Sequence, residues 1–292
     1  MKIYAGLGLY GLLLLFMGPD WWIFHREYLH LTFAVWVLAP LNLSVLERPV
    51  NWSYYLAAAL LTVGLLLPPN PWNAVLTLPY AGLVLYYLFH SAKRPVSHQV
   101  VLFYWLTGAL ATGVYLSGFR PFDYPPIILL LTANHFHVAG FGMGTLALYW
   151  FQQRPNAVSR SLAIGLLSGM ALVAAGIFIH QLGGPWWLEA VPAALFALLA
   201  AGLAAYQGAQ VRQRNFPVLQ RLVWTLSSGS LLAGMVMAIL YALRDLWPLS
   251  YIHIPNMITW HGSLNAFGFA GLGLWMAAAS APQTLKWDGV VE

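Results

Sequence analysis

Long apolar runs recur along this chain of 292 residues, and short polar or proline-containing stretches separate them. Each run has about 20 residues, which is the length an α-helix needs to cross the hydrocarbon core of a bilayer. Stretches such as Ala57-Ala58-Ala59-Leu60-Leu61 show no alternation of apolar and polar positions, so the strands of a membrane barrel are excluded. The pattern predicts helices at 3–19, 28–46, 52–69, 72–90, 98–117, 127–151, 161–181, 186–207, 221–243 and 257–280.

Composition narrows the class of protein. The chain is 60% hydrophobic and 7% charged, whereas a soluble domain carries about 25% charged residues. It has no cysteine, which excludes disulfides and thiolate metal sites. We therefore predict an all-α integral membrane protein of about ten transmembrane helices. Residues 1–292 form a single polytopic membrane domain in this interpretation, and the lipid bilayer is its main partner.

The distribution of lysine and arginine predicts the orientation. Numbering the loops alternately places ten of the 13 basic residues on one side: Lys2, Arg48, Lys93, Arg94, Arg154, Arg160, Arg212, Arg214, Arg221 and Lys286. The positive-inside rule then places both termini in the cytoplasm and the protein in the cell's inner (plasma) membrane. The net charge of +5 reflects this bias. No basic stripe with interleaved aromatic residues exists, so no nucleic-acid partner is expected.

Two segments resemble each other. His135-Phe-His-Val-Ala-Gly-Phe-Gly142 and His261-Gly-Ser-Leu-Asn-Ala-Phe-Gly268 share a histidine followed, after four residues, by a small residue and then Phe-Gly. The segments lie in the sixth and tenth predicted spans, and a separation of four spans gives them the same direction across the membrane. Two parallel four-helix repeats, 52–151 and 161–280, would then follow two N-terminal helices. Apolar helices also share residues by chance, so a chain without repeats is the alternative.

The same two segments carry the candidate site. Ionisable and polar residues within membrane spans are costly, so Asn134, His135, His137, His261 and Asn265 are candidates for function. Two residues along a regular helix turn about 200°, so His135 and His137 would face opposite sides. Asn134 and His137, and likewise His261 and Asn265, would share a face.

The functional interpretation is a metal centre, most plausibly haem b, with His135, His137 and His261 as ligands. Haem needs one or two axial histidines, whereas zinc or copper normally needs three or four protein ligands. His30 and His180 would complete a copper or zinc set. Asn134 and Asn265 would have catalytic roles, orienting a ligand or polarising a substrate oxygen. The alternative is that no cofactor binds and these residues form hydrogen bonds between helices.

His135-Phe136-His137 resembles the His-Phe-His helix of haem-copper oxidase catalytic subunits, where the two imidazoles ligate haems on opposite sides of one helix. His261-Gly262 is similar to the His-Gly of that family's other low-spin haem ligand. This resemblance implies that His135 or His137 pairs with His261 across a haem. The copper-site histidines and the cross-linked tyrosine of that family have no counterpart here, so oxygen reduction is not expected.

The whole chain resembles the YndJ-like family of bacterial multi-pass membrane proteins, through its many spans, its His-Phe-His helix and its C-terminal His-Gly helix with asparagine. This resemblance implies a class and no specific activity.

Three functions remain open at this stage. The leading hypothesis is a haem- or metal-binding membrane protein that acts as an oxidoreductase or isomerase on a lipophilic substrate. A transporter of small solutes, with histidine as the proton-coupled group, is the rival. A membrane assembly subunit is the third. Whether the protein is an enzyme, what its substrate is and how it oligomerises are left open by the residues alone.

Overall fold

The computed structural model describes residues 2–48 and 50–280, and within these ranges no residue forms a β-strand. The helical elements are α1 (Lys2–Met17), α2 (Pro19–Phe24), α3 (Arg26–Phe33), η1 (Ala34–Leu38), α4 (Ala39–Val45), α5 (Trp52–Leu66), α6 (Pro71–Val75), α7 (Leu78–Phe89), α8 (Val96–Leu116), η2 (Pro121–Asp123), α9 (Pro126–His135), η3 (Phe136–Met143), α10 (Gly144–Gln153), α11 (Ala157–Gln181), α12 (Trp187–Gln213), α13 (Val218–Ala242), α14 (Ile254–Asn256), η4 (Met257–Gly262), η5 (Leu264–Gly271) and α15 (Leu272–Ser280). The all-helical membrane class predicted from the sequence is confirmed.

Seven helical spans in the described chain are long and apolar enough to cross a membrane: Arg26–Val45, Pro71–Phe89, Val96–Leu116, Pro126–Gln153, Ala157–Gln181, Trp187–Gln213 and Val218–Ala242. Two further predicted spans form shorter apolar helices, Ala5–Met17 and Trp52–Leu66. The last predicted span, 257–280, consists of the consecutive elements η4, η5 and α15. Every predicted span is therefore helical, and ten crossings remain a prediction.

The helix boundaries follow local chemistry. Asn51 begins α5 by accepting a hydrogen bond from the backbone N–H of Tyr54 at 3.2 Å. Asn156 and Ser159 form a reciprocal capping box at the start of α11. Proline occupies the first turn of α2, α6 and α9, where its missing N–H costs no hydrogen bond. These local signals place the helix boundaries at the polar and proline-containing stretches that separate the apolar runs.

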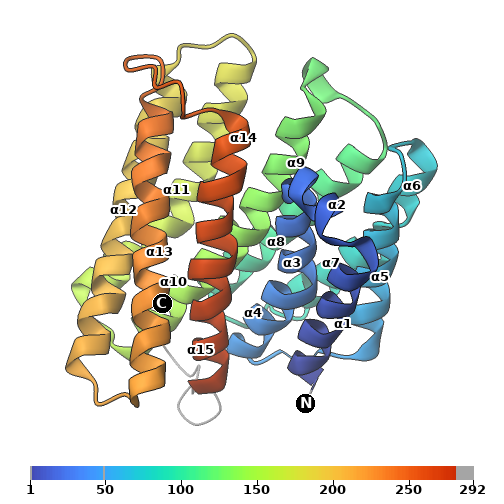
Figure 1. The fold of residues 1–292 in the computed structure, drawn as a ribbon. Coiled ribbons are helices and arrows are strands. Elements are labelled where there is room, and N and C mark those ends of the chain that lie inside the picture. The colour runs from blue at the N-terminus through green and yellow to red at the C-terminus, as the bar shows by residue number, and fades with distance from the viewer. Residues whose placement is uncertain (1, 49, 281–292) are drawn as a thin grey trace. The chain divides into compact units, whose positions relative to one another are not determined.

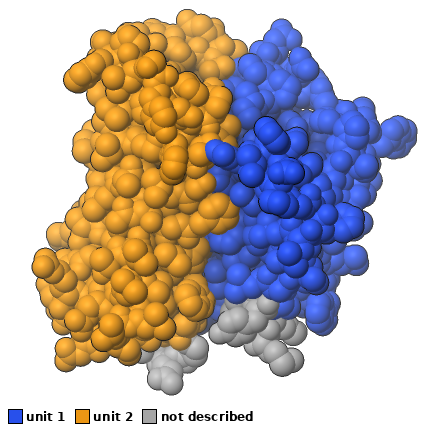
Figure 2. Space-filling model, in the orientation of Figure 1, with its two compact units in different colours: residues 1–145, 281–292 blue, residues 146–280 orange. Residues whose placement is uncertain are grey.

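The chain divides into two compact units, which Figure 2 shows in different colours. Unit 1 comprises the described residues up to Thr145, and unit 2 comprises Leu146–Ser280. The boundary falls within the helical segment Pro126–Gln153. The predicted repeats, 52–151 and 161–280, stay a prediction, because this division does not test whether the two halves are related.

Each unit has its own aromatic core. In unit 1, Trp105 stacks on Phe141 with ring centroids 4.8 Å apart and meets Tyr80 edge-on at 5.8 Å. In unit 2, α12 packs against both α11 and α13, and these three helices run side by side in Figure 1. Trp150 and Trp224 pack together there with centroids 4.9 Å apart. The first cluster includes Phe141 of η3, the element that carries His137, and the second joins α10 to α13.

Candidate functional site

Both histidine motifs lie in or beside π-helical turns. His135 ends α9 and is followed directly by η3, which contains His137. His261 lies in η4, and Asn265 lies in η5. The regular α-helix assumed from the sequence is therefore replaced by i→i+5 hydrogen bonding in both motifs. π-helical segments in proteins are rare and occur frequently at functional sites.

His137 is fully enclosed in unit 1. Its side chain is 1% exposed. Its Nδ1 lies 2.8 Å from the backbone oxygen of Ala133, and its Nε2 lies 3.4 Å from the hydroxyl of Tyr80. The same hydroxyl accepts a hydrogen bond from Trp105 Nε1 at 2.8 Å. A methyl group at Gly108 would lie 2.5 Å from His137 Nδ1, so only glycine leaves room for this imidazole.

These contacts fix the direction of the hydrogen bonds. A carbonyl oxygen only accepts, so His137 Nδ1 carries the proton and Nε2 carries a lone pair. Tyr80 receives the Trp105 N–H and is thereby free to donate its own hydrogen to His137 Nε2. The imidazole therefore belongs to a buried chain of hydrogen bonds from Trp105 to Ala133, which favours a packing role for His137.

His135 has the same proton arrangement in a different setting. Its side chain is exposed, and its Nδ1 lies 2.8 Å from the backbone oxygen of Leu131. Nδ1 is therefore the protonated nitrogen and Nε2 is the basic one. His135 is exposed and His137 is buried, so the two imidazoles face different sides of the helix.

Asn134 is buried beside these histidines and uses both hydrogens of its amide group. Nδ2 donates to the backbone oxygens of Glu27 and Leu130, each at 3.0 Å. Its Oδ1 is buried and has no hydrogen-bond partner in the described structure. With both donors used, Asn134 can accept from a ligand but has no N–H left with which to polarise a substrate oxygen.

In unit 2, His261 and Asn265 contact each other as their spacing predicts. Asn265 Nδ2 donates to the backbone oxygen of His261 at 2.8 Å. His261 Nδ1 lies 2.9 Å from the backbone oxygen of Gly234 in α13 and 3.2 Å from Asn265 Nδ2. The carbonyl is closer and can only accept, so Nδ1 carries the proton and Nε2 the lone pair.

Asn265 is 6% exposed, and its Oδ1 has no hydrogen-bond partner among the residues described. A methyl group at Gly234 would lie 2.8 Å from its Nδ2. Glycine at position 234 therefore allows α13 to approach the asparagine, and it brings the carbonyl that orients His261. Unlike Asn134, this side chain lies against an imidazole that is partly exposed.

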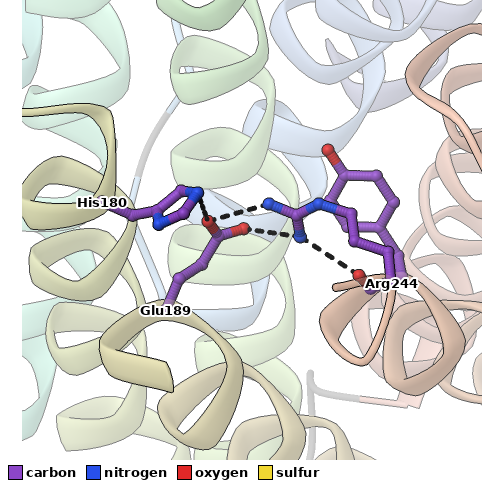
Figure 3. Close-up of polar contacts among 4 residues, drawn as sticks. His180, Glu189 and Arg244 are labelled. Carbon is purple, nitrogen blue, oxygen red and sulfur yellow. Dashed lines mark hydrogen bonds and ion pairs between the residues drawn. The ribbon is translucent and has the colours of Figure 1, made fainter. Parts of the chain in front are cut away.

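The other two predicted metal ligands, His30 and His180, lie in different units of the protein. His30 is buried in α3 of unit 1. His180, at the end of α11 in unit 2, faces Glu189 of α12 with its Nε2 3.7 Å from Oε2 (Figure 3). Arg244 binds the same carboxylate with two N···O distances of 3.0 Å. A metal ion at His180 would be repelled by this guanidinium, which disfavours that prediction.

Arg244 keeps its charge in this cluster. Partial burial acts to lower its pKa, but the hydrogen bond to Glu189 and the nearby Tyr241 and Asp245 hold the pKa above its ordinary value. Arg244 also donates to the backbone oxygen of Tyr241 at 3.1 Å and lies 4.2 Å from that ring's centroid. The cluster connects α11, α12 and the end of α13, so it stabilises the packing of these helices.

No three or more His, Asp or Glu side chains in the described ranges form a group that could hold a metal ion. His135 and His137 belong to unit 1 and His261 belongs to unit 2. A haem shared between these histidines therefore remains a prediction.

The sequence did not predict which residues enclose or orient each histidine. Tyr80, Trp105 and Gly108 enclose His137 from α7 and α8, and Gly234 orients His261 from α13. Glu189 carried a detectable signal, because it is a carboxylate in the first turn of an otherwise apolar helix. The others look like ordinary residues of apolar helices.

In the comparison with known proteins, one protein family matches most of the chain. The family model described as YndJ-like protein matches residues 29–269, which covers most of the described helices and both histidine motifs. No curated protein and no solved structure matches the chain.

Proposed function

Since this chain belongs to the YndJ-like family, we propose that it is a multi-pass membrane protein that binds haem through an imidazole of its histidine motifs, that of His135 in unit 1 or that of His261 in unit 2. The observation that carries the proposal is the contact that Nδ1 of each ring makes, which determines which ring nitrogen carries the proton. Each Nδ1–H is directed at a backbone carbonyl, of Leu131 and of Gly234 respectively. This hydrogen bond fixes the tautomer in which Nε2 is the ligand atom, as is usual for metal-binding histidines.

The surroundings of the two rings support the proposal. Both belong to π-helical motifs, and both are more accessible than His137. A haem there would supply redox or Lewis-acid chemistry to a lipophilic substrate, which would reach the site from the bilayer. Asn134 and Asn265 each retain a buried carbonyl oxygen, so they would accept a hydrogen bond from the substrate or cofactor.

The test is an ultraviolet–visible spectrum of the detergent-purified full chain before and after dithionite, with metal analysis of the same sample. We expect a Soret band that shifts on reduction and weakens in His135→Ala or in His261→Ala. His90→Ala is the matched control, because His90 Nδ1 also lies against a backbone carbonyl, that of Tyr86 at 2.9 Å, but outside the π-helical motifs. A colourless, metal-free protein from cells supplied with haem would reject the proposal.

A transporter is a second candidate. Its supporting observation is that the π-helical turns 136–143 and 264–271 overlap when the two similar motifs are aligned at His135 and His261. Interrupted helices at corresponding positions are typical of binding sites in transporters. Proton uptake into proteoliposomes, followed with a pH-sensitive dye, tests it. Uptake abolished by Asn265→Ala in a colourless protein would favour transport, and no uptake in a haem-containing protein would favour the first proposal.

We also propose that the protein lies in the plasma membrane with both termini in the cytoplasm. The support is the ten-to-three distribution of basic residues between alternate loops. Reporter fusions at the connection between α12 and α13 and at the connection between α11 and α12 test the orientation. A cytoplasmic reporter should be active only at the first of these positions.

A further inference from the structure

Unit 2 carries a strong charge asymmetry. Its six arginines are Arg154, Arg160, Arg212, Arg214, Arg221 and Arg244, and its two carboxylates are Glu189 and Asp245. Glu189 is bound to Arg244. The other five arginines lie near the end of α10, the start of α11, the end of α12 and the start of α13, a region that we call the arginine end. No carboxylate of the described unit 2 lies in these segments.

Two arginines of this region are held in place by neutral groups. Arg154 donates to the side-chain oxygens of Gln210, at 3.0 Å, and Gln213. Arg214 donates to the side-chain and backbone oxygens of Gln153, each at 3.1 Å. Amide oxygens orient a guanidinium but leave its positive charge uncompensated.

Aromatic rings complete the setting of Arg214. Its guanidinium carbon lies 5.7 Å from the ring centroid of Trp150 and 5.9 Å from that of Phe216. Stacking on rings keeps the planar guanidinium rigid, so less entropy is lost when it binds a phosphate. The ordinary explanation is that Arg214 only caps the end of α10, where its bond to the Gln153 carbonyl opposes the helix dipole. Capping of α10 by Arg214 does not explain why Arg154 is held beside it.

Exposed apolar side chains surround the arginine end. Val158 begins α11, and Val218, Leu219 and Leu222 begin α13. Charged groups next to an apolar rim fit an amphiphile, whose phosphate would meet the arginines while its acyl chains cover the rim. We propose that Arg154 and Arg214 bind the phosphate headgroup of an anionic phospholipid. Free inorganic phosphate has no acyl chains and would leave the apolar rim uncovered.

The experiment is native mass spectrometry of the detergent-solubilised full chain, titrated with phosphatidylglycerol or with phosphatidylcholine of identical acyl chains. We expect preferential binding of phosphatidylglycerol, reduced about tenfold in the double variant Arg154→Gln/Arg214→Gln, since this variant removes both oriented guanidinium groups that would form charge-assisted hydrogen bonds with the phosphate. The matched control is Arg160→Gln/Arg212→Gln, which removes equal charge from the same end of the unit at exposed positions. Neither of these guanidinium groups is oriented by a glutamine of the described chain, as Arg154 and Arg214 are, so binding should change less than about twofold.

Two further variants keep the test decisive if the double variant does not fold. Arg154→Gln alone removes no helix cap, and Arg214→Lys keeps the charge while losing the planar fork, so each should weaken phosphatidylglycerol binding on its own. Equal losses in the site and control pairs, or equal binding of the two lipids, would overturn the proposal. Displacement of phosphatidylglycerol by inorganic phosphate, to the same extent in variant and parent, would overturn it as well.

Discussion

His137 and His261 stand in similar sequence motifs, and both lie in π-helical turns, yet their surroundings differ. His137 is enclosed by Tyr80, Gly108 and Trp105 from other helices, and its Nδ1 hydrogen bond stays within its own helix. His261 is partly exposed, and its Nδ1 hydrogen bond reaches the carbonyl of Gly234 on α13. A histidine within a predicted membrane span is therefore either enclosed by packing or partly exposed, and only its tertiary neighbours distinguish the two cases.

The largest effect is expected from removing the enclosed ring. His137→Ala leaves a cavity and an unsatisfied Tyr80 hydroxyl, so it should lower the free energy of unfolding by about 3 kcal/mol. His261→Ala removes a partly exposed ring and should cost about 1 kcal/mol. Equilibrium unfolding in mixed detergent micelles measures both. Equal losses of unfolding free energy in the two variants would show that the burial of His137 contributes no more to stability than the partly exposed His261 does.

Gly108→Ala tests the same enclosure without touching the histidine. The added methyl group would lie 2.5 Å from His137 Nδ1 and 3.2 Å from the Ala133 oxygen. Overpacking of this kind should cost about 2 kcal/mol. Gly82→Ala in α7 is the control, because nothing lies within 4 Å of its added carbon. A Gly108→Ala protein as stable as the control would show that His137 is loosely held.

Tyr80→Phe isolates the hydrogen bonds around His137. It leaves the Trp105 indole N–H without its acceptor and His137 Nε2 without the phenol, while the ring packing is kept. A loss of about 1 kcal/mol is expected in the same unfolding assay. The indole fluorescence of Trp105 should change as well. An unchanged stability would mean that ring packing alone holds His137.

The smallest change in stability is expected at Gly234. The three atoms nearest to its added methyl group would all belong to the side-chain amide of Asn265, with Nδ2 at 2.8 Å and Oδ1 at 3.0 Å, and a side-chain amide can shift more easily than backbone. Gly234→Ala should therefore cost less than about 1 kcal/mol but displace Asn265 from His261 and reduce the proposed cofactor content. Gly229→Ala, on the same helix and with nothing within 4 Å, is its control. Identical Soret absorption in Gly234→Ala and Gly229→Ala would show that the contact between Asn265 and His261 does not affect cofactor binding.

Some features could be predicted from the sequence because they depend on local chemistry. A bilayer requires long apolar helices, so the membrane class and the positions of the helices follow from the apolar runs. The contact between His261 and Asn265 follows from their spacing along one helix. The capping of α11 by Asn156 is similarly local.

Tertiary structure alone decided which histidine is buried. Tyr80 meets His137 across 57 positions, and Arg244 meets Glu189 across 55. The long helices of the described chain are apolar on most of their surface, so the residue pattern does not specify which faces pack together. The close approach that glycine permits at positions 108 and 234, and the partners it admits, arise only when the helices pack.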